Sequence, residues 1–252
     1  MEPMSSAIYP SLKGKKVLIT GGGSGIGAGL VTAFVQQGAR VHFIDLVDEV
    51  SATLDTGVLG VTPTFYKCDL TDTPALEATL AAVLADGPVN ILLNNAARDD
   101  RHTLSEVTSE FFDKNIAVNL KHLAMTTRVI APGMKTAGGG AIINFGSISW
   151  HLGLPDLVLY ETAKAGIEGM TRALARELGP DNIRVTSIIP GNVKTPRQMK
   201  WYTPEGERQI VESQCLPGRI EPKHVASLAL FLASDDASLC TGHGYWIDAG
   251  WR

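Results

Sequence analysis

A glycine-rich turn near the start of the chain constrains its fold more than any other stretch. Val17-Leu18-Ile19 is a short apolar run of the kind found in buried parallel strands. It leads directly into Thr20-Gly21-Gly22-Gly23-Ser24-Gly25-Ile26-Gly27, and a helical apolar pattern follows as far as Gly38. Glycine lets the backbone approach a pyrophosphate closely, and a helix N-terminus offers unpaired N–H groups. This order predicts a dinucleotide site at Gly21, Gly23, Ser24, Gly25, Ile26 and Gly27, with a tight turn that binds nothing as the alternative.

Short apolar runs alternate with helical patterns along the rest of the chain. We expect further strands at 41–44, 64–67, 89–93, 141–145, 184–189 and 244–247, and helices at 74–84, 109–135, 160–178 and 221–232. Such alternation favours a parallel sheet that helices cover on both faces. The 252 residues contain no linker or repeat, so the sequence predicts one doubly wound α/β domain with seven parallel strands. Residues 1–14 form an N-terminal arm, and 197–214 is typical of a lid or substrate loop.

Charge and cysteine usage exclude several functional classes. A net charge of −4 argues against nucleic acid or an anionic membrane as a partner. No apolar run approaches the ~20 residues that span a bilayer, and the first residues do not resemble a secretory signal. Cys68, Cys215 and Cys240 are scattered and lack metal-binding spacing, which indicates reduced thiols in the cytoplasm. The histidines show no ligand pattern either, and we predict no metal.

An acidic residue indicates which dinucleotide is bound. Asp45 ends the second expected strand, about twenty residues beyond the glycine turn, where a carboxylate can bind the adenosine ribose hydroxyls and repel a 2′-phosphate. Neither Ser24 nor Leu46 is basic. We therefore expect NAD rather than NADP, although Asp45 is also suited to a helix N-cap.

Small and polar residues follow the other strands, at the sheet edge where ligands bind in such folds. We expect them to complete the cofactor site. They are Leu46, Asp69, Leu70, Asn95, Ala96, Ala97, Pro190, Gly191, Val193 and Thr195.

Tyr160 and Lys164 are four residues apart in an expected helix and therefore share one face. A phenol with a pKa of ~10 is a poor base at neutral pH, but a nearby cation lowers that pKa. A tyrosine so tuned can take a proton from a hydroxyl group. The spacing also occurs by chance, and an exposed helix pair is the alternative interpretation.

Together, these motifs resemble the ordered set of the short-chain dehydrogenase/reductase family. The set comprises the glycine turn, Asn94-Asn95-Ala96, Asn119, Ser147, Tyr160 with Lys164, and Pro190-Gly191, and it covers essentially the whole chain. The resemblance implies a Rossmann fold, NAD(P)-dependent hydride transfer and a homotetramer. It implies catalytic roles for Asn119, Ser147, Tyr160 and Lys164, with Tyr160 and Lys164 also contacting the cofactor. Ala97 departs from the family, which commonly has glycine there.

Three segments are similar to the branch of this family that oxidises aldoses at C1. They are 145–154, 201–206 and 245–252. This similarity implies that a sugar, D-xylose first, is oxidised with NAD to its aldonolactone. L-Arabinose, D-galactose, L-fucose and an acidic or sulfonated sugar remain alternatives, as do a 3-oxoacyl or carbonyl reductase and a nucleotide-sensing binding protein. The expected sugar contacts, each also compatible with loop packing, are Arg98, Ser147, Ser149, Trp150, His151, Tyr160, Asn192 and Trp201.

The expected mechanism assigns one task to each catalytic residue. Tyr160, as phenolate, removes the anomeric hydroxyl proton, and Lys164 lowers the tyrosine pKa. Ser147 donates a hydrogen bond to the substrate oxygen, and Asn119 holds a water that passes the proton onward from Lys164. Activity should rise with pH through an apparent tyrosine pKa below ~10.

Overall fold

In the computed structural model, which describes residues 5–47, 62–200 and 202–251, parallel strand pairs form one sheet. Its seven strands lie in the order β3-β2-β1-β4-β5-β6-β7. They are β1 (Lys16–Thr20), β2 (Arg40–Asp45), β3 (Thr64–Lys67), β4 (Ile91–Asn94), β5 (Gly140–Phe145), β6 (Ile183–Pro190) and β7 (Gly244–Ile247). The predicted doubly wound parallel sheet is confirmed.

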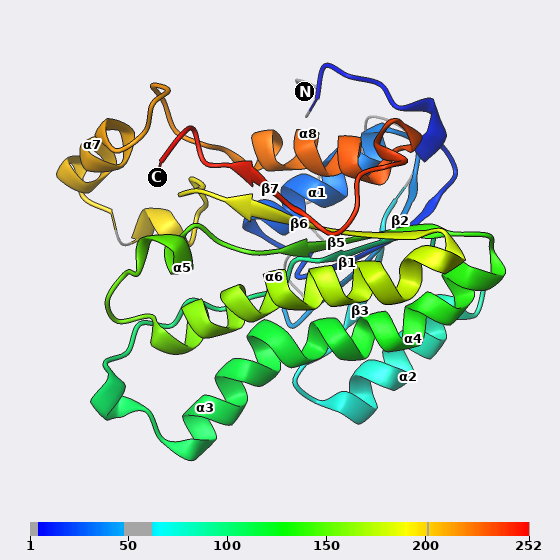
Figure 1. The fold of residues 1–252 in the computed structure, drawn as a ribbon, viewed down its shortest axis with the longest axis horizontal. Coiled ribbons are helices and arrows are strands. Elements are labelled where there is room, and N and C mark those ends of the chain that lie inside the picture. Colours follow the sequence, from blue (N-terminus) through cyan, green and yellow to red (C-terminus); the bar gives the residue numbers. More distant parts are fainter. Residues whose placement is uncertain (1–4, 48–61, 201, 252) are drawn as a thin grey trace.

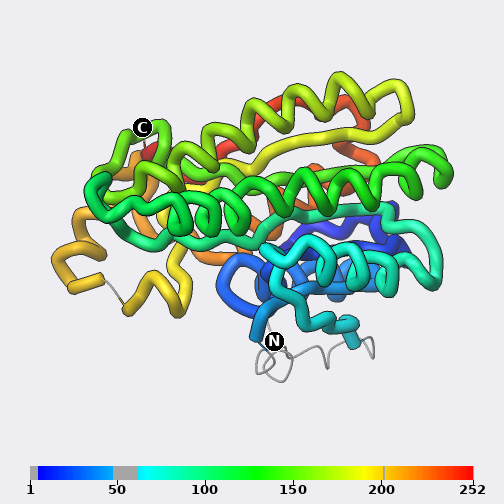
Figure 2. The backbone as a smooth tube through the Cα atoms, turned by 90° about the horizontal axis from the view of Figure 1, so that it is seen from below, coloured from blue at the N-terminus to red at the C-terminus, as the bar shows by residue number. Residues whose placement is uncertain are grey.

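Helices cover both faces of this sheet (Figure 1). Helices α1 and α8 pack together on one face, and α2, α4 and α6 lie side by side on the other (Figures 1 and 2). The helices are α1 (Gly25–Gln36), α2 (Thr73–Leu84), α3 (Ser109–Ile116), α4 (His122–Thr136), α5 (Ser149–Leu152), α6 (Val158–Leu178), α7 (Pro204–Glu212) and α8 (Pro222–Ala233). None of the helices in the described ranges is both long and apolar enough to cross a membrane.

The hydrophobic core is divided between the two faces of the sheet. Val17 and Ile19 of β1 pack into the cluster beneath α1 and α8, whereas Leu18 between them packs into the cluster beneath α2 and α4. All three side chains are fully buried. Successive strand residues point to opposite faces, and a strand covered on both sides is therefore apolar at every position.

The strand order changes direction between β1 and β4, which are neighbours in the sheet. In open α/β sheets, ligands bind at such a point, outside the carboxyl ends of the strands. Helices α5 and α7 lie at this end of the sheet, on the left in Figure 1. We therefore expect a ligand site among the loops that follow β1, β2, β4, β5 and β6.

The observed elements differ from the expected ones in four places. The expected helix 109–135 is interrupted by a π-helical turn at Ala117–Lys121 that contains Asn119. The segment between Ser147 and Tyr160 contains α5, and 197–214 contains α7. In the N-terminal arm, Pro10–Leu12 form a short 3-10 turn whose Leu12 is buried in the core.

Candidate active site

The glycine turn is closely packed against the loop that follows β4. Gly21 has φ of +67°, and a Cβ there would lie 2.8 Å from Cα of Ala96. A Cβ on Gly27 would lie 1.8 Å from the carbonyl oxygen of Gly21. Asn95 holds the two segments together, because its Nδ2 donates to the carbonyl oxygens of Thr20 and Gly21, each at 3.0 Å. This close packing leaves no room for side chains at Gly21 and Gly27, so the turn presents only backbone groups at the N-terminus of α1.

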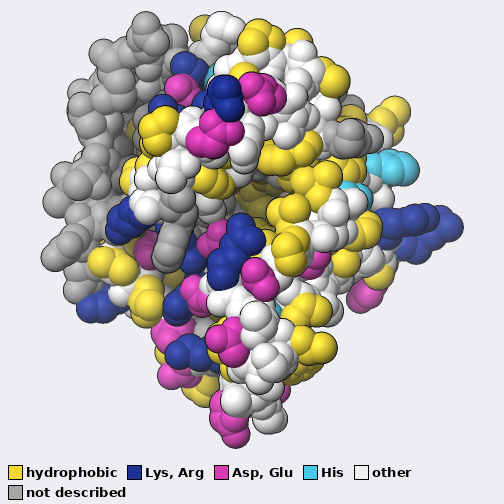
Figure 3. Space-filling model, turned by 90° about the vertical axis from the view of Figure 1, so that its left-hand side faces the viewer, with side chains coloured by type: hydrophobic (Ala, Val, Ile, Leu, Met, Phe, Trp, Pro, Cys, Tyr) yellow, Lys and Arg dark blue, Asp and Glu magenta, His cyan; other side chains and the backbone are white. Residues whose placement is uncertain are grey.

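This turn forms one end of a cleft of about 810 Å³ along the carboxyl ends of the strands. Figure 3 looks onto this end of the molecule and shows a hollow with hydrophobic side chains along a wall and charged side chains at its rim. Most of the residues expected at the site line the cleft. They are Gly21, Ser24, Gly25, Ile26, Gly27, Asp45, Leu46, Asp69, Leu70, Asn95, Ala96, Ala97, Arg98, Ser147, Ser149, Tyr160, Lys164, Pro190, Gly191, Asn192, Val193 and Thr195.

Four expected site residues are not among those that line the cleft: Gly23, Asn119, Trp150 and His151. A fifth, Trp201, lies outside the described residues. Gly23 remains close to the site, because its backbone N donates to Oδ2 of Asp45 at 2.8 Å. Oδ1 of Asp45 accepts a hydrogen bond from the backbone N of Leu46 at 2.7 Å. The carboxylate is therefore oriented by the glycine turn itself.

The expected reacting groups converge on one wall of the cleft. Tyr160 and Lys164 lie one turn apart on α6, with the Lys164 Nζ 5.4 Å from the Tyr160 ring centroid. The same Nζ donates to the carbonyl oxygen of Phe145 at 2.7 Å, and burial lowers the pKa of Lys164 to about 8. Ser147 Oγ lies 2.9 Å from Ser149 Oγ and accepts from the backbone N of Ser149 at 3.1 Å. These contacts orient the serine hydroxyl and the ammonium.

The pKa of Tyr160 departs from the expected direction. Burial raises it to about 12, and the negative charge of Asp99 adds to the rise. A hydrogen bond with Ser147 and the positive charges of Arg197 and Arg101 act in the opposite direction. The expectation of a pKa below ~10 is thus wrong for the chain by itself, since the loss of hydration outweighs the neighbouring cations.

Asn119 acts on the backbone at the rim of the cleft. Its Oδ1 accepts from the backbone N of Arg98 at 2.8 Å, and its Nδ2 donates to the Arg98 carbonyl oxygen at 2.9 Å and to Oδ1 of Asn115 at 3.0 Å. In the sequence, a polar Asn119 among apolar helical neighbours indicates either a bound water or a helix irregularity, and the π-helical turn confirms the irregularity. From its place in the π-helical turn, the Asn119 side chain thus holds the loop after β4 through the Arg98 backbone.

Trp150 and His151, two of the expected sugar contacts, are both bound to Glu168 of α6. Nε1 of Trp150 donates to Oε1 of Glu168 at 2.7 Å, and Nε2 of His151 lies 3.0 Å from the same oxygen. The His151 ring also packs against Trp150 and Trp246, with centroid distances of 3.6 Å and 4.3 Å. Glu168 on α6 thus holds both side chains, and neither is among the residues that line the cleft.

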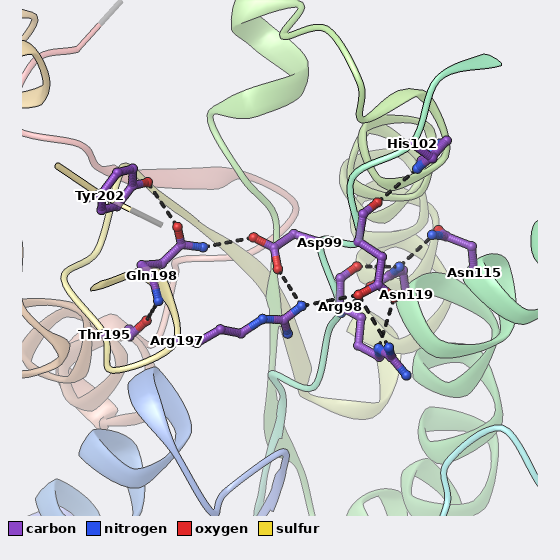
Figure 4. Close-up of polar contacts among 10 residues, drawn as sticks. Arg98, Asp99, His102, Asn115, Asn119, Thr195, Arg197, Gln198 and Tyr202 are labelled. Carbon is purple, nitrogen blue, oxygen red and sulfur yellow. Dashed lines mark hydrogen bonds and ion pairs between the residues drawn. The ribbon is translucent and has the colours of Figure 1, made fainter. Parts of the chain in front are cut away.

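Charged and amide side chains from two loops meet at the cleft rim (Figure 4). Asp99 Oδ1 lies 2.8 Å from Arg197 Nη2, and Asp99 Oδ2 accepts from Gln198 Nε2 at 2.8 Å. Oε1 of Gln198 accepts in turn from the Tyr202 hydroxyl at 2.9 Å. These four residues line the cleft. Asp99 belongs to the polar run 98–102, which the sequence also offers as a source of sugar contacts, whereas Arg197, Gln198 and Tyr202 lie in the expected lid and were not singled out. In the sequence, they resemble solvated loop side chains. The structure distinguishes them, because Asp99 pairs with Arg197 and Gln198, which lie almost one hundred residues further along the chain.

Known proteins resemble this chain over nearly its whole length. Residues 21–252 match the family model for enoyl-(acyl carrier protein) reductase. The D-xylose 1-dehydrogenase of Caulobacter vibrioides is 66% identical over 99% of this chain and 100% of that protein. A Rhizobium meliloti protein named "Probable galactose dehydrogenase GalD" is 45% identical over 98% of both chains. The crystal structure of 3-oxoacyl-[acyl-carrier protein] reductase from Brucella melitensis superposes with a TM-score of 0.90 at 31% identity, over 99% of this chain and 96% of that one.

Proposed function

The chain belongs to the short-chain dehydrogenase/reductase family of oxidoreductases, and we propose that it oxidises an aldose at C1 to the aldonolactone with NAD as hydride acceptor. D-Xylose is the first expected substrate, because the relative that acts on it is 66% identical. The observation that carries the proposal is the convergence of Ser147, Tyr160 and Lys164 on a cleft that also contains the glycine turn.

The residues present fit a dinucleotide. The turn at Gly21 and Gly27 has no room for side chains, and its backbone N–H groups and the N-terminus of α1 suit a pyrophosphate. Asp45, Leu46 and Val47 line the far end of the cleft, and no Lys or Arg occurs between Arg40 and Lys67. This charge pattern supports NAD over NADP, since a 2′-phosphate would meet a carboxylate there.

When bound, the nicotinamide ring accepts the hydride from C1. The chain's own residues handle the proton. Tyr160 takes it from the anomeric hydroxyl, and Ser147 donates a hydrogen bond to the same oxygen as that oxygen becomes a carbonyl. Lys164 is held by Phe145 beneath the tyrosine, where its charge favours the phenolate. Asn119 keeps the Arg98 backbone in place and, in this proposal, holds the water that passes the proton onward from Lys164.

We further propose that the protein is a cytoplasmic homotetramer. Leu104, Phe112 and Val158 are exposed apolar side chains near the start of α3 and α6, which supports self-association. Cys68, Cys215 and Cys240 are free thiols, as expected in a reducing compartment. Light scattering on the purified protein tests the assembly, with an expected mass of four times 26.9 kDa.

A substrate panel tests the proposed reaction. Pentoses, hexoses and sugar acids are assayed for NADH formation and ranked by kcat/KM, with D-xylose expected first and its lactone identified as the product. The alternative, a 3-oxoacyl reductase, has one supporting observation in the structural similarity to such an enzyme. A 3-oxoacyl reductase would reduce an acetoacetyl thioester with NADPH and would not oxidise any aldose. These two results together would overturn the proposal.

A further inference from the structure

Asp99 connects two segments that face each other across the cleft (Figure 4). It lies in the loop after β4, whereas its partners Arg197 and Gln198 lie in the segment after β6. Each carboxylate oxygen has one partner, Oδ1 with Arg197 and Oδ2 with Gln198. A carboxylate fixed at both oxygens points in one direction, and both contacts come from the same side of the cleft.

The carboxylate retains capacity for more hydrogen bonds. An ionised carboxylate offers about four acceptor positions, and the contacts with Arg197 and Gln198 occupy two of them. The Asp99 side chain is 26% exposed and lines the cleft. Its charge raises the pKa of both Tyr160 and Lys164, which places it within electrostatic reach of the reacting groups. The unused acceptor positions are thus at the substrate end of the cleft.

The orientation of Asp99 is set by a chain of hydrogen bonds. Gln198 accepts from the hydroxyl of Tyr202, which accepts from Nδ2 of Asn192. Nη2 of Arg219 donates to Oδ1 of Asn192 at 2.8 Å. The carbonyl oxygen of the Gln198 side chain is already bound by the Tyr202 hydroxyl. Gln198 therefore presents its NH₂ group to Asp99. Such support preorganises a binding group, as precise recognition of hydroxyl groups requires.

We propose that Asp99 is a specificity-determining residue whose carboxylate accepts hydrogen bonds from a pair of sugar hydroxyls away from C1, while Arg197 and Gln198 hold it in position. This assignment rests on the proposed function. Sugar hydroxyls are donors that an ionised carboxylate binds strongly, and a site built for them discriminates against an analogue that lacks one.

The same geometry favours neutral sugars over anionic ones. The arginines at this rim are already paired: Arg197 with Asp99, and Arg98 through its Nε with Asp100 at 3.0 Å. Arg101 also lines the cleft and donates to the carbonyl oxygen of Pro155 at 3.5 Å. A carboxylate or sulfonate on the sugar would approach the charge of Asp99. The acidic or sulfonated sugars that remained alternatives from the sequence should therefore be poor substrates.

The test combines D99N with deoxygenated substrates. The best aldose and analogues that each lack one hydroxyl away from C1 are compared on the wild-type chain, D99N and D113N. D113N is the control, because it removes one negative charge at an exposed position on α3 that is not among those lining the cleft. NADH binding, followed by fluorescence, and circular dichroism establish that D99N retains its fold and cofactor site.

For the parent sugar, we expect KM to rise about 10-fold to 100-fold in D99N, the size of a lost hydrogen bond to a charged group. At least one analogue should lose about tenfold or more in kcat/KM on the wild type, and less than about threefold on D99N. D113N should behave as the wild type, and NADH binding should be unchanged in both variants.

Two negative results have different meanings. If the wild type oxidises aldoses but no analogue is penalised, or the penalties persist unchanged in D99N, the assignment of Asp99 fails and the proposed function stands. If the wild type forms no NADH with any aldose, the proposed function fails and this assignment fails with it.

Discussion

Glu168 lies one helical turn beyond Lys164 on the same face of α6, and the two side chains bind residues on either side of Ser147, Lys164 at the end of β5 and Glu168 in the segment that follows. Nζ of Lys164 donates to the Phe145 carbonyl oxygen, and Oε1 of Glu168 accepts from Trp150 Nε1. Ser147 lies between these two anchored residues. The helix that carries Tyr160 thus also helps to position the segment that contains Ser147.

Removal of Glu168 should misplace Ser147. We expect E168A to lower kcat about 10-fold to 100-fold, because small shifts in a reacting group have effects of that size. E168Q keeps an acceptor oxygen for Trp150 and should retain most of the activity. E177A, at an exposed position on the same helix, is the control. Steady-state kinetics and NADH binding are measured, and an E168A enzyme as active as the wild type would contradict the positioning role.

Loss of the Tyr160 hydroxyl should abolish turnover without loss of the fold. We expect Y160F to reduce kcat about 10²-fold to 10⁴-fold, the usual contribution of a positioned general base. NADH binding should remain, because the glycine turn and Asp45 are untouched. Y9F, remote from the cleft, should match the wild type. The assignment is wrong if Y160F keeps near-full turnover with saturating NAD⁺ and sugar.

The dependence of kcat on pH should shift in opposite directions for two charge variants. In the proposed mechanism deprotonated Tyr160 is the active form, so kcat should rise with pH until the phenol has ionised. Asp99 raises the pKa of Tyr160 and Arg101 lowers it. The rise should therefore move to lower pH in D99N and to higher pH in R101M. D113N on α3 is the control, and equal or same-direction shifts in the two variants would refute this account.

Cofactor selectivity should depend on Asp45. The wild type is expected to favour NAD⁺ over NADP⁺ in kcat/KM, and D45N should lower that ratio by about tenfold or more, as for one charged hydrogen bond. Asn retains an acceptor for the backbone N of Gly23, so the glycine turn keeps its support. D113N again controls for the loss of one negative charge. An unchanged ratio in D45N would show that Asp45 does not contact the ribose.

Two glycines within helices should respond in opposite ways to alanine. A Cβ on Gly27 would clash with the Gly21 carbonyl oxygen, so G27A should weaken NADH binding and lower the melting temperature. A Cβ on Gly169 meets nothing within 4 Å, and G169A should stabilise the fold by up to ~1 kcal/mol. Thermal unfolding and NADH titration distinguish them. Equal behaviour of the two variants would contradict the packing seen at the turn.

The order of strands and helices follows from local patterns in the sequence. Buried strands such as Val17–Ile19 are apolar at every position, and the helices show their own period, because each periodicity reflects a backbone geometry set by near neighbours. The glycine turn and the Tyr160–Lys164 pair are equally local. Even the irregularity at Asn119 was indicated by one polar residue in an apolar helical stretch.

Other features depended on contacts between distant segments. Trp150 and His151 were expected to bind sugar, but Glu168, seventeen or more residues away, accepts hydrogen bonds from both. No periodicity connects Asp99 with Arg197. The rise in the Tyr160 pKa arises from burial among several loops, whereas the Tyr160–Lys164 spacing alone indicated a fall.

The sequence by itself therefore determined the order of the strands and helices, the glycine turn and the placement of Tyr160 and Lys164 on one helix face, since each depends on residues within a few positions of one another. Only the tertiary structure decided which side chains reach the cleft, how Asp99 is held and how strongly Tyr160 retains its proton. Hydrogen bonding and loss of hydration depend on what surrounds a group in space, and segments far apart in the chain provide those surroundings.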